Sequence, residues 1–247
     1  METMSPEGLE SWIAEYPAYM RERDGFEVRP ERADEFLLLL GLAERVARAA
    51  EAYLVLAKSD FTLEAITLVR AAFEHAITLE WVFVTRHGVD QFQRQVDRDR
   101  IAYFRKLNAW LKNDEIAAKI KELRASSKGD RLLSFARIIA QLDDHEHTLQ
   151  KLYDILSQQV HVTFGAVTAH LDEAEDGRLA IVHDPQDAMR HGTLYALAIA
   201  CMLSWWVLAN LTEDNEALVR LDRDSDKLAI PTNLAHVVSV SLRRPDL

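Results

Sequence analysis

The sequence predicts an all-α fold, a single-domain bundle of about eight to ten helices, and three observations lead to this class. Glycine and proline are scarce, with 8 and 6 residues in a chain of 247, whereas an average chain of this length would carry about 17 and 12. Turns must therefore be few and elements long, which argues against sandwiches, barrels and propellers. Apolar residues recur at helical spacing along most of the chain. Hydrophobic residues make up 49% and charged residues 28%, an ordinary globular composition.

Apolar spacing and capping signals divide the chain into successive helices. Asp60 is the expected N-cap of the third helix, and His87-Gly88 is its expected stop. Asp143 and Glu146 have the spacing of a capping box for the seventh helix. The predicted helices span residues 5–21, 31–58, 61–87, 90–108, 112–125, 130–142, 146–169, 186–212 and 214–223, with a short one near 232–241.

Strand character is confined to residues 177–183, which predict either a short β-hairpin arm near 178–183 or an extended connection. The sequence contains no internal repeat, low-complexity tract or Ser/Gly linker. We therefore expect one helical domain over residues 1–247. Its expected parts are an N-terminal helical extension (1–30), a core bundle (31–212) and a C-terminal helical tail (213–247).

Charge and cysteine content restrict the partners and the compartment. The 40 acidic and 29 basic side chains give a net charge of −11, and an acidic surface disfavours general coating of nucleic acid but leaves room for a local basic groove. One cysteine excludes a disulfide framework and a multi-cysteine zinc site. The first residues lack the basic and apolar regions of a Sec signal peptide. These features favour a cytoplasmic location.

The run Gly192–Thr212 carries no charge and approaches the length of a bilayer span. Ser204, the pair Trp205-Trp206 and Asn210 lie inside this run, whereas aromatic and polar residues of a span gather at its ends. We therefore expect a central helix over 193–212 that neighbouring helices bury on every face, and no membrane span.

The motifs of the large enzyme classes are missing. There is no G-x-G-x-x-G, Walker loop, G-x-S-x-G, H-E-x-x-H or paired C-x-x-C. Paired E-x-x-H motifs of carboxylate-bridged di-iron bundles are also missing. The acidic and histidine-rich stretch 143–147 is interpreted as a solvated capping turn, because consecutive residues seldom converge on one ion. We expect no cofactor and no bound metal.

The most informative segment is Thr62–Val84, an apolar helix with Arg70 and Glu74 in the middle of its apolar stripe. Two interpretations remain open. The pair could be a buried ion pair that fixes the register of neighbouring helices, in which case Arg70→Ala would cost about 3 kcal/mol or more. Alternatively it could be a polar site in an apolar cleft, where Arg70 binds an anion or phosphate and Glu74 orients it.

The seventh helix carries Ser157 and His161 four residues apart on one flank, so a hydroxyl–imidazole hydrogen bond is geometrically available. Tyr153 lies at the other edge of the apolar stripe of this helix. If the polar flank packs towards Arg70, the resulting set could grip an anionic group and move a proton. We expect His161 to be the histidine nearest Arg70, because His75 projects about 140° away from Arg70 on the third helix.

The run Leu68–Thr78 (LVRAAFEHAIT), followed by Trp81 and by the Y-x-x-x-S-x-x-x-H pattern of residues 153–161, resembles an uncharacterised bacterial family of all-helical proteins. That family is catalogued only as a domain of unknown function. The resemblance covers about residues 35–210. It implies that Arg70, Glu74 and His161 are the positions of interest.

More loosely, the chain is similar to the HEPN superfamily, helical proteins of toxin–antitoxin and phage-defence systems. Several members cut RNA with an Arg-x(4–6)-His motif, and Arg70–His75 matches its shortest form. The resemblance implies a metal-independent ribonuclease with RNA as partner. The candidate catalytic residues are Arg70, Glu74, His161 and His75. The weak candidates for phosphate contacts are Arg94, Arg98 and Arg105 on one face of the fourth helix, although interleaved acidic residues favour a solvated face.

Two functions therefore stay open. One is a non-catalytic helical binding or interaction protein, in a bacterial defence or toxin–antitoxin context, that takes a small anionic ligand or a protein partner. The other is a HEPN-like metal-independent ribonuclease. A homodimer formed through an apolar helix face is expected. The expected ligand-binding residues are Arg70, Glu74, Tyr153, Ser157 and His161.

Overall fold

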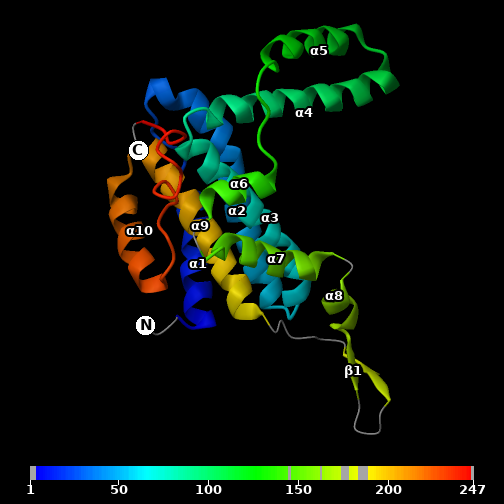
Figure 1. The fold of residues 1–247 in the computed structure, drawn as a ribbon, viewed down its shortest axis with the longest axis vertical. Helices are drawn as coiled ribbons and strands as arrows, with labels where there is room; N and C mark the ends of the chain where they lie inside the picture. The colour runs from blue at the N-terminus through cyan, green and yellow to red at the C-terminus, as the bar shows by residue number, and fades with distance from the viewer. Residues whose placement is uncertain (1–3, 144–145, 162, 174–177, 183–188, 246–247) are drawn as a thin grey trace.

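The computed structural model describes residues 4–143, 146–161, 163–173, 178–182 and 189–245, and within these ranges the chain forms ten α-helices and one short hairpin (Figure 1). The predicted all-α fold is confirmed. The helices are α1 (Pro6–Arg21), α2 (Ala33–Ala57), α3 (Thr62–Val84), α4 (Gly88–Leu111), α5 (Asp114–Ser126), α6 (Phe135–Leu142), α7 (Thr148–Val160), α8 (Phe164–Thr168), α9 (Arg190–Leu211) and α10 (Asn215–Leu228). The strands are β1 (Leu171–Glu173) and β2 (Leu179–Ile181).

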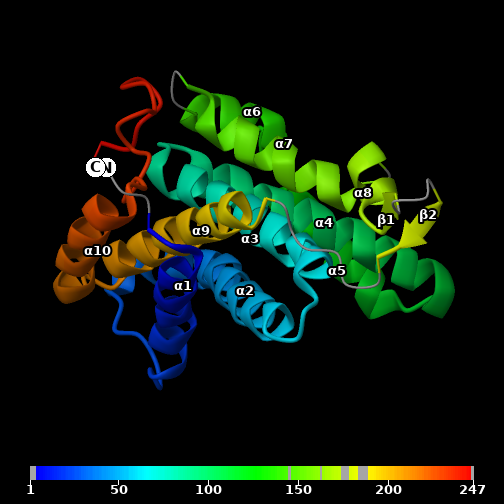
Figure 2. The same cartoon turned by 90° about the horizontal axis from the view of Figure 1, so that it is seen from below.

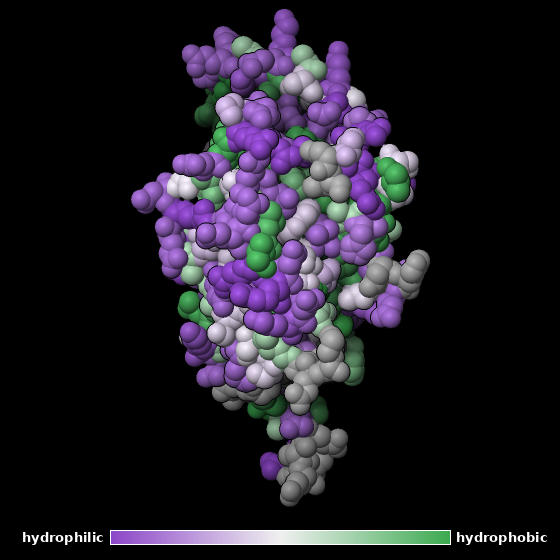
Figure 3. Space-filling view, turned by 90° about the vertical axis from the view of Figure 1, so that its left-hand side faces the viewer, coloured by the Kyte–Doolittle hydropathy of each residue, from purple (hydrophilic) through white to green (hydrophobic). Residues whose placement is uncertain are grey.

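Helices α3 and α9 lie side by side at the centre of the bundle (Figure 2). Helices α1 and α2 pack on one side of this pair, and α6 and α7 pack on the other side of α3. Helix α10 packs against α9 through Leu221 and Leu228, and its outer surface is mostly hydrophilic with scattered hydrophobic side chains (Figure 3). The buried residues of α1, α2, α6, α7 and α10 therefore belong to one core around the central pair.

Helix α9 has no polar face, and this explains its central place. Every residue from Ala196 to Ala209 is buried. Among the described residues, α9 is the one helix long and apolar enough to cross a membrane, and most of it is buried inside the bundle. The prediction that the 193–212 helix is buried is confirmed.

Helices α4 and α5 form an antiparallel hairpin that projects from the body (Figure 1). A separate small apolar cluster of Ile101, Ile120 and Leu123 holds the two helices together. The buried carboxylate of Asp97 accepts a hydrogen bond of 2.6 Å from the Ser126 hydroxyl. The hairpin is thus stabilised by its own contacts.

The short β-hairpin is confirmed near the predicted place. Strands β1 and β2 pair antiparallel, with Leu171 opposite Ile181 and Glu173 opposite Leu179. His183, the last residue of the predicted arm, lies outside the described residues. The partner strand 171–173 directly follows a segment that the periodicity predicts to be helical up to residue 169.

The predicted helix 146–169 is wrong as one continuous helix. Helix α7 ends at Val160, and His161 is extended, with φ −89° and ψ 166°. Three β-branched residues surround His161 in the sequence Val160-His161-Val162-Thr163, and such residues weaken a helix. The Thr163 side chain then caps α8 by accepting a hydrogen bond of 3.3 Å from the Ala166 N–H.

Several predicted helix ends also need correction. Asp60 does not cap α3: it adopts a left-handed conformation (φ 62°) in the tight turn after α2, and Phe61 precedes the helix without a side-chain cap. Helix α3 ends at Val84, before the predicted His87-Gly88 stop, and Gly88 instead begins α4.

The predicted capping box at the start of α7 is wrong in register. The helix begins at Thr148 after a left-handed His147, so Glu146 precedes the helix and does not occupy its third position. The Asp143 carboxylate nevertheless accepts hydrogen bonds of 2.9 and 3.1 Å from the Leu149 and Gln150 N–H groups. Asp143, five residues before the helix begins, therefore provides acceptors for two N–H groups of the first turn.

The predicted helix near 232–241 does not form. This segment consists of turns with isolated backbone bonds such as that of the Val237 N–H to the Leu234 carbonyl, and the residues just after it bond to the junction of α3 and α4. The Arg86 N–H donates to the Leu242 carbonyl over 2.9 Å, and the Arg244 N–H donates to the Val84 carbonyl over 2.8 Å. The C-terminal segment is thereby fixed across the α3–α4 junction.

Glu80 on α3 is a fully buried carboxyl that also holds this segment. Its Oε1 accepts a hydrogen bond of 2.8 Å from the Leu234 N–H, and its Oε2 has no hydrogen-bond partner among the described residues. Burial raises the pKa of Glu80 to about 8, and the Leu234 N–H opposes this rise only in part.

We predict that Glu80 makes the stability of the protein fall with rising pH. The folded protein keeps this proton up to about pH 8, whereas the unfolded chain releases it near the ordinary value of 4.5. Between these values Glu80 should lower the free energy of unfolding by up to about 1.4 kcal/mol per pH unit. Urea denaturation of wild type and Glu80→Gln at pH 5.5, 7 and 8.5 measures this slope.

In Glu80→Gln the amide keeps an acceptor for Leu234 but cannot ionise, so that part of the slope should vanish and the variant should be the more stable protein at pH 8.5. Glu64→Gln, at an exposed position of the same helix, is the matched control and should follow wild type. Parallel pH curves for wild type and Glu80→Gln would contradict the prediction.

Candidate functional site

Arg70 and Glu74 lie on the side of α3 that faces α7. Helix α7 packs its apolar residues Leu149, Leu152 and Leu156 into the core, and this packing brings its flanking polar side chains over Arg70. The Arg70 Nε–H donates to Glu74 Oε1 over 3.1 Å. The interaction expected from their spacing is therefore present.

Tyr153 of α7 closes a ring of hydrogen bonds with this pair. Its hydroxyl accepts from Arg70 NH2 over 3.0 Å and donates to Glu74 Oε1 over 3.2 Å. The Tyr153 ring is held in turn by the Phe135 ring of α6, with 4.9 Å between ring centroids. These contacts fix the plane of the guanidinium, because each of the three side chains restrains the other two.

His161 completes the cluster from the first residue after α7. Its Nε2 lies 2.9 Å from Arg70 NH1. A guanidinium can only donate, so Nε2 accepts and the proton of the neutral imidazole sits on Nδ1. Because a protonated imidazole offers no acceptor, this contact exists only with neutral His161. The His161 residue is exposed, so the imidazole lies at the solvent side of the cluster.

The expectation that His161, and not His75, is nearest Arg70 is confirmed by these contacts. The His75 Nδ1 instead bonds to the Ala71 carbonyl, and its Nε2 accepts from the Arg45 Nε–H of α2 over 3.2 Å. Burial lowers the pKa of the His75 imidazole, and the Arg45 guanidinium lowers it further, against the opposing effect of the Ala71 carbonyl. His75 is thus engaged on the α2 side of α3.

The Ser157 side chain forms no hydrogen bond with the Arg70 cluster in the described part of the chain. Its hydroxyl oxygen is buried and has no hydrogen-bond partner in the described part of the chain. The Ser157–His161 side-chain hydrogen bond suggested by the spacing does not form, because α7 ends at Val160 and His161 turns away in an extended conformation. The Ser157 hydroxyl is therefore left with its hydrogen-bonding capacity unused.

The cluster is neither fully enclosed nor an ordinary surface pair. The Arg70 side chain is 18% exposed and the Glu74 side chain 39%. Three of the five guanidinium N–H groups have partners, namely Glu74, Tyr153 and His161, and the other two have none among the described residues. The partly open edge therefore offers donors from Arg70 and from His161 Nδ1, which is the donor set for an anionic oxygen.

The three arginines of α4 that were candidates for phosphate contacts are not part of the Arg70 cluster. Arg98 donates to the Gly129 and Asp130 carbonyls over 2.7 and 3.4 Å, which ties α4 to the loop after α5. Arg94 lies over Gly129. Arg105 is exposed. Within the described residues no hydrogen bond joins these three arginines to the Arg70 cluster.

The described residues include no group of three or more His, Cys, Asp or Glu side chains that could hold a metal ion. In the stretch 143–147, Asp144 and His145 lie outside the described residues, and the Asp143 carboxylate is used by the N–H groups of α7. Sequence reasoning missed Glu80, although a single charge inside the apolar run ITLEWVFV could have pointed to it.

Comparison with known proteins places the chain in a family. The model of a family of unknown function, DUF5677, matches residues 36–178, more than half of the chain. The match confirms the resemblance to an uncharacterised domain and ends near residue 178 instead of 210. No curated protein and no solved structure match the chain.

We predict that Tyr153→Phe destabilises the protein by about 1–2 kcal/mol, because it removes two partly buried hydrogen bonds to charged groups and keeps the ring. Chemical denaturation at neutral pH measures this change. Tyr103→Phe on α4, where the residue is exposed, is the matched control and should lie within about 0.5 kcal/mol of wild type. Equal stability of Tyr153→Phe and wild type would show that the ring of hydrogen bonds contributes nothing.

Proposed function

This chain belongs to DUF5677, a family of unknown function, and we propose that it is a helical binding protein whose Arg70 cluster takes a small anionic ligand. One observation carries the proposal. Three protein groups hold the Arg70 guanidinium in one plane while its remaining donors, beside the exposed His161, stay without protein partners in the described chain.

Preorganisation is the physical reason why such a cluster suits binding. A free arginine side chain loses rotamer freedom when it grips a ligand, whereas a guanidinium already fixed by Glu74 and Tyr153 has lost that freedom on folding. The Glu74 carboxylate neutralises most of the positive charge of Arg70. An anion is therefore attracted to the cluster only where it reaches the open edge of the guanidinium. A single carboxylate or phosphate group matches this size and charge.

Ribonuclease chemistry is the alternative, supported by the similarity to the HEPN superfamily. Cleavage without a metal needs a base that accepts a proton from the ribose hydroxyl and a cation beside the phosphate. His161 Nε2 already accepts from Arg70, and His75 Nε2 already accepts from Arg45. Neither histidine therefore has an unoccupied acceptor nitrogen beside the Arg70 guanidinium to serve as the base. This favours a binding function over catalysis.

The wider context rests on the resemblances. We propose a cytoplasmic protein of a bacterial defence or toxin–antitoxin system, as the HEPN similarity implies. The expected homodimer also stays a proposal. Large apolar residues are exposed on α8 and the β-hairpin, including Phe164, Leu179 and Ile181, and at the end of α4, including Trp110, so these are the surfaces where we would look for a protein partner.

We predict that inorganic phosphate raises the melting temperature of the wild-type protein above that in chloride of equal ionic strength, and that Arg70→Met abolishes the difference. Arg105→Met, which removes an exposed arginine of α4, should keep it. The readout compares each variant with itself in two salts, so a change in basal stability does not affect it. An unchanged phosphate response in Arg70→Met would refute binding at this cluster.

The same proteins separate binding from catalysis. Incubation with single-stranded RNA in the presence of EDTA should give no cleavage products for wild type under the proposal. Cleavage that is lost in His161→Ala and retained in His75→Ala would replace the binding function with ribonuclease activity at this cluster. Cleavage lost in His75→Ala instead would require an arrangement other than the hydrogen bonds described above.

A further inference from the structure

The α4–α5 hairpin carries a charge opposite to that of the rest of the protein. Residues 94–131 contain eleven Lys or Arg and six Asp or Glu, which gives a net charge of +5. The whole chain has a net charge of −11, so the remaining residues together carry −16. Nothing in the proposed function of the Arg70 cluster uses this hairpin, which projects from the body (Figure 1).

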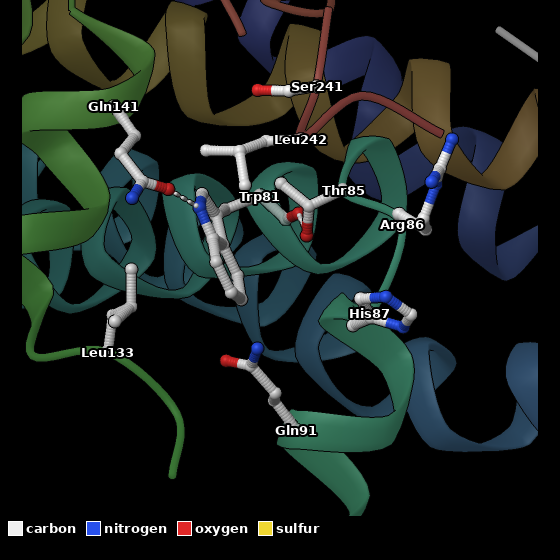
Figure 4. A pocket seen from close by; sticks show the side chains of 9 residues that line it. All are labelled: Trp81, Thr85, Arg86, His87, Gln91, Leu133, Gln141, Ser241 and Leu242. Atoms are coloured by element: carbon white, nitrogen blue, oxygen red, sulfur yellow. Dashed lines mark hydrogen bonds between the residues drawn. The ribbon is translucent and has the colours of Figure 1, made fainter. Parts of the chain in front are cut away.

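The hairpin is anchored to the body at its root. The chain enters α4 after Arg86 and returns from α5 past Leu133, and both residues line one cavity together with the end of α3 and the C-terminal segment (Figure 4). Beside this cavity the Trp81 indole N–H donates to Gln141 Oε1 over 2.8 Å. The Arg86 N–H donates to the Leu242 carbonyl over 2.9 Å. Several parts of the body therefore hold the root, while the far part of the hairpin presents its surfaces to solvent.

Six cationic side chains lie on one side of the hairpin. Ile101 of α4 and Ile120 of α5 belong to the apolar cluster between the two helices, so they mark the directions in which the helices face each other. At about 100° per residue, Arg105 and Arg124 each lie about 40° round from these isoleucines in the same sense. In an antiparallel pair of helices, rotation in the same sense leads to the same side. Within about 100° in this sense lie Arg94, Arg98, Arg105, Lys121, Arg124 and Lys128, which we call the basic face.

No acidic residue of α4 or α5 lies within the same range of rotation. Asp97 points between the helices, where it is buried and accepts a hydrogen bond of 2.6 Å from the Ser126 hydroxyl. Asp99 lies on the outer side of α4 and accepts a hydrogen bond of 3.0 Å from the Gln95 amide. Asp114 is closest in rotation, and it stands at the far end of the hairpin, where α5 begins. The interleaved acidic residues of α4 therefore do not neutralise its arginines.

The protein itself leaves the charge of the basic face uncompensated. In the described part of the chain, the ion pairs of the hairpin join Arg100 to Asp97 and Lys119 to Glu122, and all four residues lie outside the basic face. Arg98 donates to two backbone carbonyls of the loop after α5, which orients its guanidinium but brings no negative charge. The six cations are therefore available to an anionic partner.

The arrangement of the cations matches a row of phosphates. On α4 they extend over eleven residues from Arg94 to Arg105, which is about 16 Å along the helix axis. Packed helices stand about 8–10 Å apart, so the cations of α5 form a second row beside the first. A nucleic-acid duplex carries one negative charge per about 1.7 Å of its axis, so about nine phosphates occupy this length. Two rows of long side chains can contact the phosphates of both strands.

The composition of the basic face favours a duplex over a single strand. Proteins that bind single strands stack the unpaired bases on aromatic rings, and the basic face includes no aromatic residue. The exposed rings of α4 belong to Tyr103 and Trp110, which lie about 160° and 140° round the helix from Arg105. A duplex stacks its bases inside and presents phosphates outside, so it needs no ring from the protein.

We propose that the basic face of the α4–α5 hairpin binds the phosphate backbone of a nucleic-acid duplex without reading its sequence. The acidic remainder of the protein is repelled by phosphates, which confines the duplex to the hairpin. A free phosphate ion meets one or two of these cations, whereas the duplex meets all six, so the duplex is the ligand of this face. The site is independent of the Arg70 cluster.

Fluorescence anisotropy with labelled duplexes of 24 base pairs tests the proposal. At 50 mM KCl the better of duplex DNA and duplex RNA should bind with a dissociation constant below 10 µM, and the comparison of the two distinguishes the source of the backbone. Six phosphate contacts on DNA predict that the affinity falls about 40-fold between 50 and 100 mM KCl. Two duplexes of unrelated sequence should bind equally, because phosphate contacts carry no sequence information.

Matched double variants locate the binding. Arg105→Gln with Arg124→Gln removes one cation of the basic face from each helix, and it should weaken binding at least tenfold and flatten the salt dependence. Arg100→Gln with Lys119→Gln also removes one cation from each helix, but both lie on the opposite side of the hairpin, and binding should stay within twofold of wild type. The two double variants have the same net charge, so long-range attraction does not account for a difference between them.

Lys121→Gln with Lys128→Gln repeats the test at other positions of the basic face, and circular dichroism checks that each variant is folded. Arg70→Met should bind the duplex as wild type does, so the failure of phosphate binding at the Arg70 cluster would leave this result unchanged.

The proposal is overturned if neither duplex binds with a dissociation constant below 10 µM at 50 mM KCl. It is equally overturned if the basic-face variants and the opposite-side variant weaken binding to the same extent, or if a single strand binds more tightly than the duplex. Competition by polyglutamate as strong as that by unlabelled duplex would instead assign the basic face to an acidic protein partner.

Discussion

The enclosure of α3 is the constraint on which the other features depend. Its apolar residues are buried from every side by α2, α9, α6 and α7. The polar side chains of α3 that lie among these neighbours cannot reach bulk water freely, so they find partners on a neighbouring element. Arg70 finds Tyr153 on α7, Trp81 finds Gln141 on α6, and Glu80 finds the Leu234 N–H of the C-terminal segment.

Those partnerships explain how one helix forms part of two different polar regions. The short helix α6 touches both, since Phe135 at its first residue packs on Tyr153 and Gln141 near its end holds Trp81. At Arg70 the partners leave donors open towards solvent. At Gln91, on the helix that follows α3, they leave an acceptor buried without a donor. The two regions thus differ in exposure and in the hydrogen-bonding group that is left unused.

Sequence periodicity predicted what depends on local pattern. The charge-free run that became α9 and the Arg70–Glu74 pair on one stripe of α3 follow from spacing on regular helices. His161 was expected beside Arg70, but it arrives there as an extended residue after the end of α7. The break at His161 was missed because a run of β-branched residues still carries helical apolar spacing. The role of Glu80 could not be foreseen, because its partner lies 154 residues away in a segment without periodicity.

The α4–α5 hairpin has a consequence for how the protein opens. Its apolar cluster of Ile101, Ile120 and Leu123 is separate from the main core, and three buried residues supply little hydrophobic free energy. Such a unit unfolds locally at a much lower free energy than the whole protein. The far halves of α4 and α5 would therefore exchange their amide hydrogens and admit proteases while α3 and α9 stay closed, so a nick in this hairpin can leave the rest of the bundle folded.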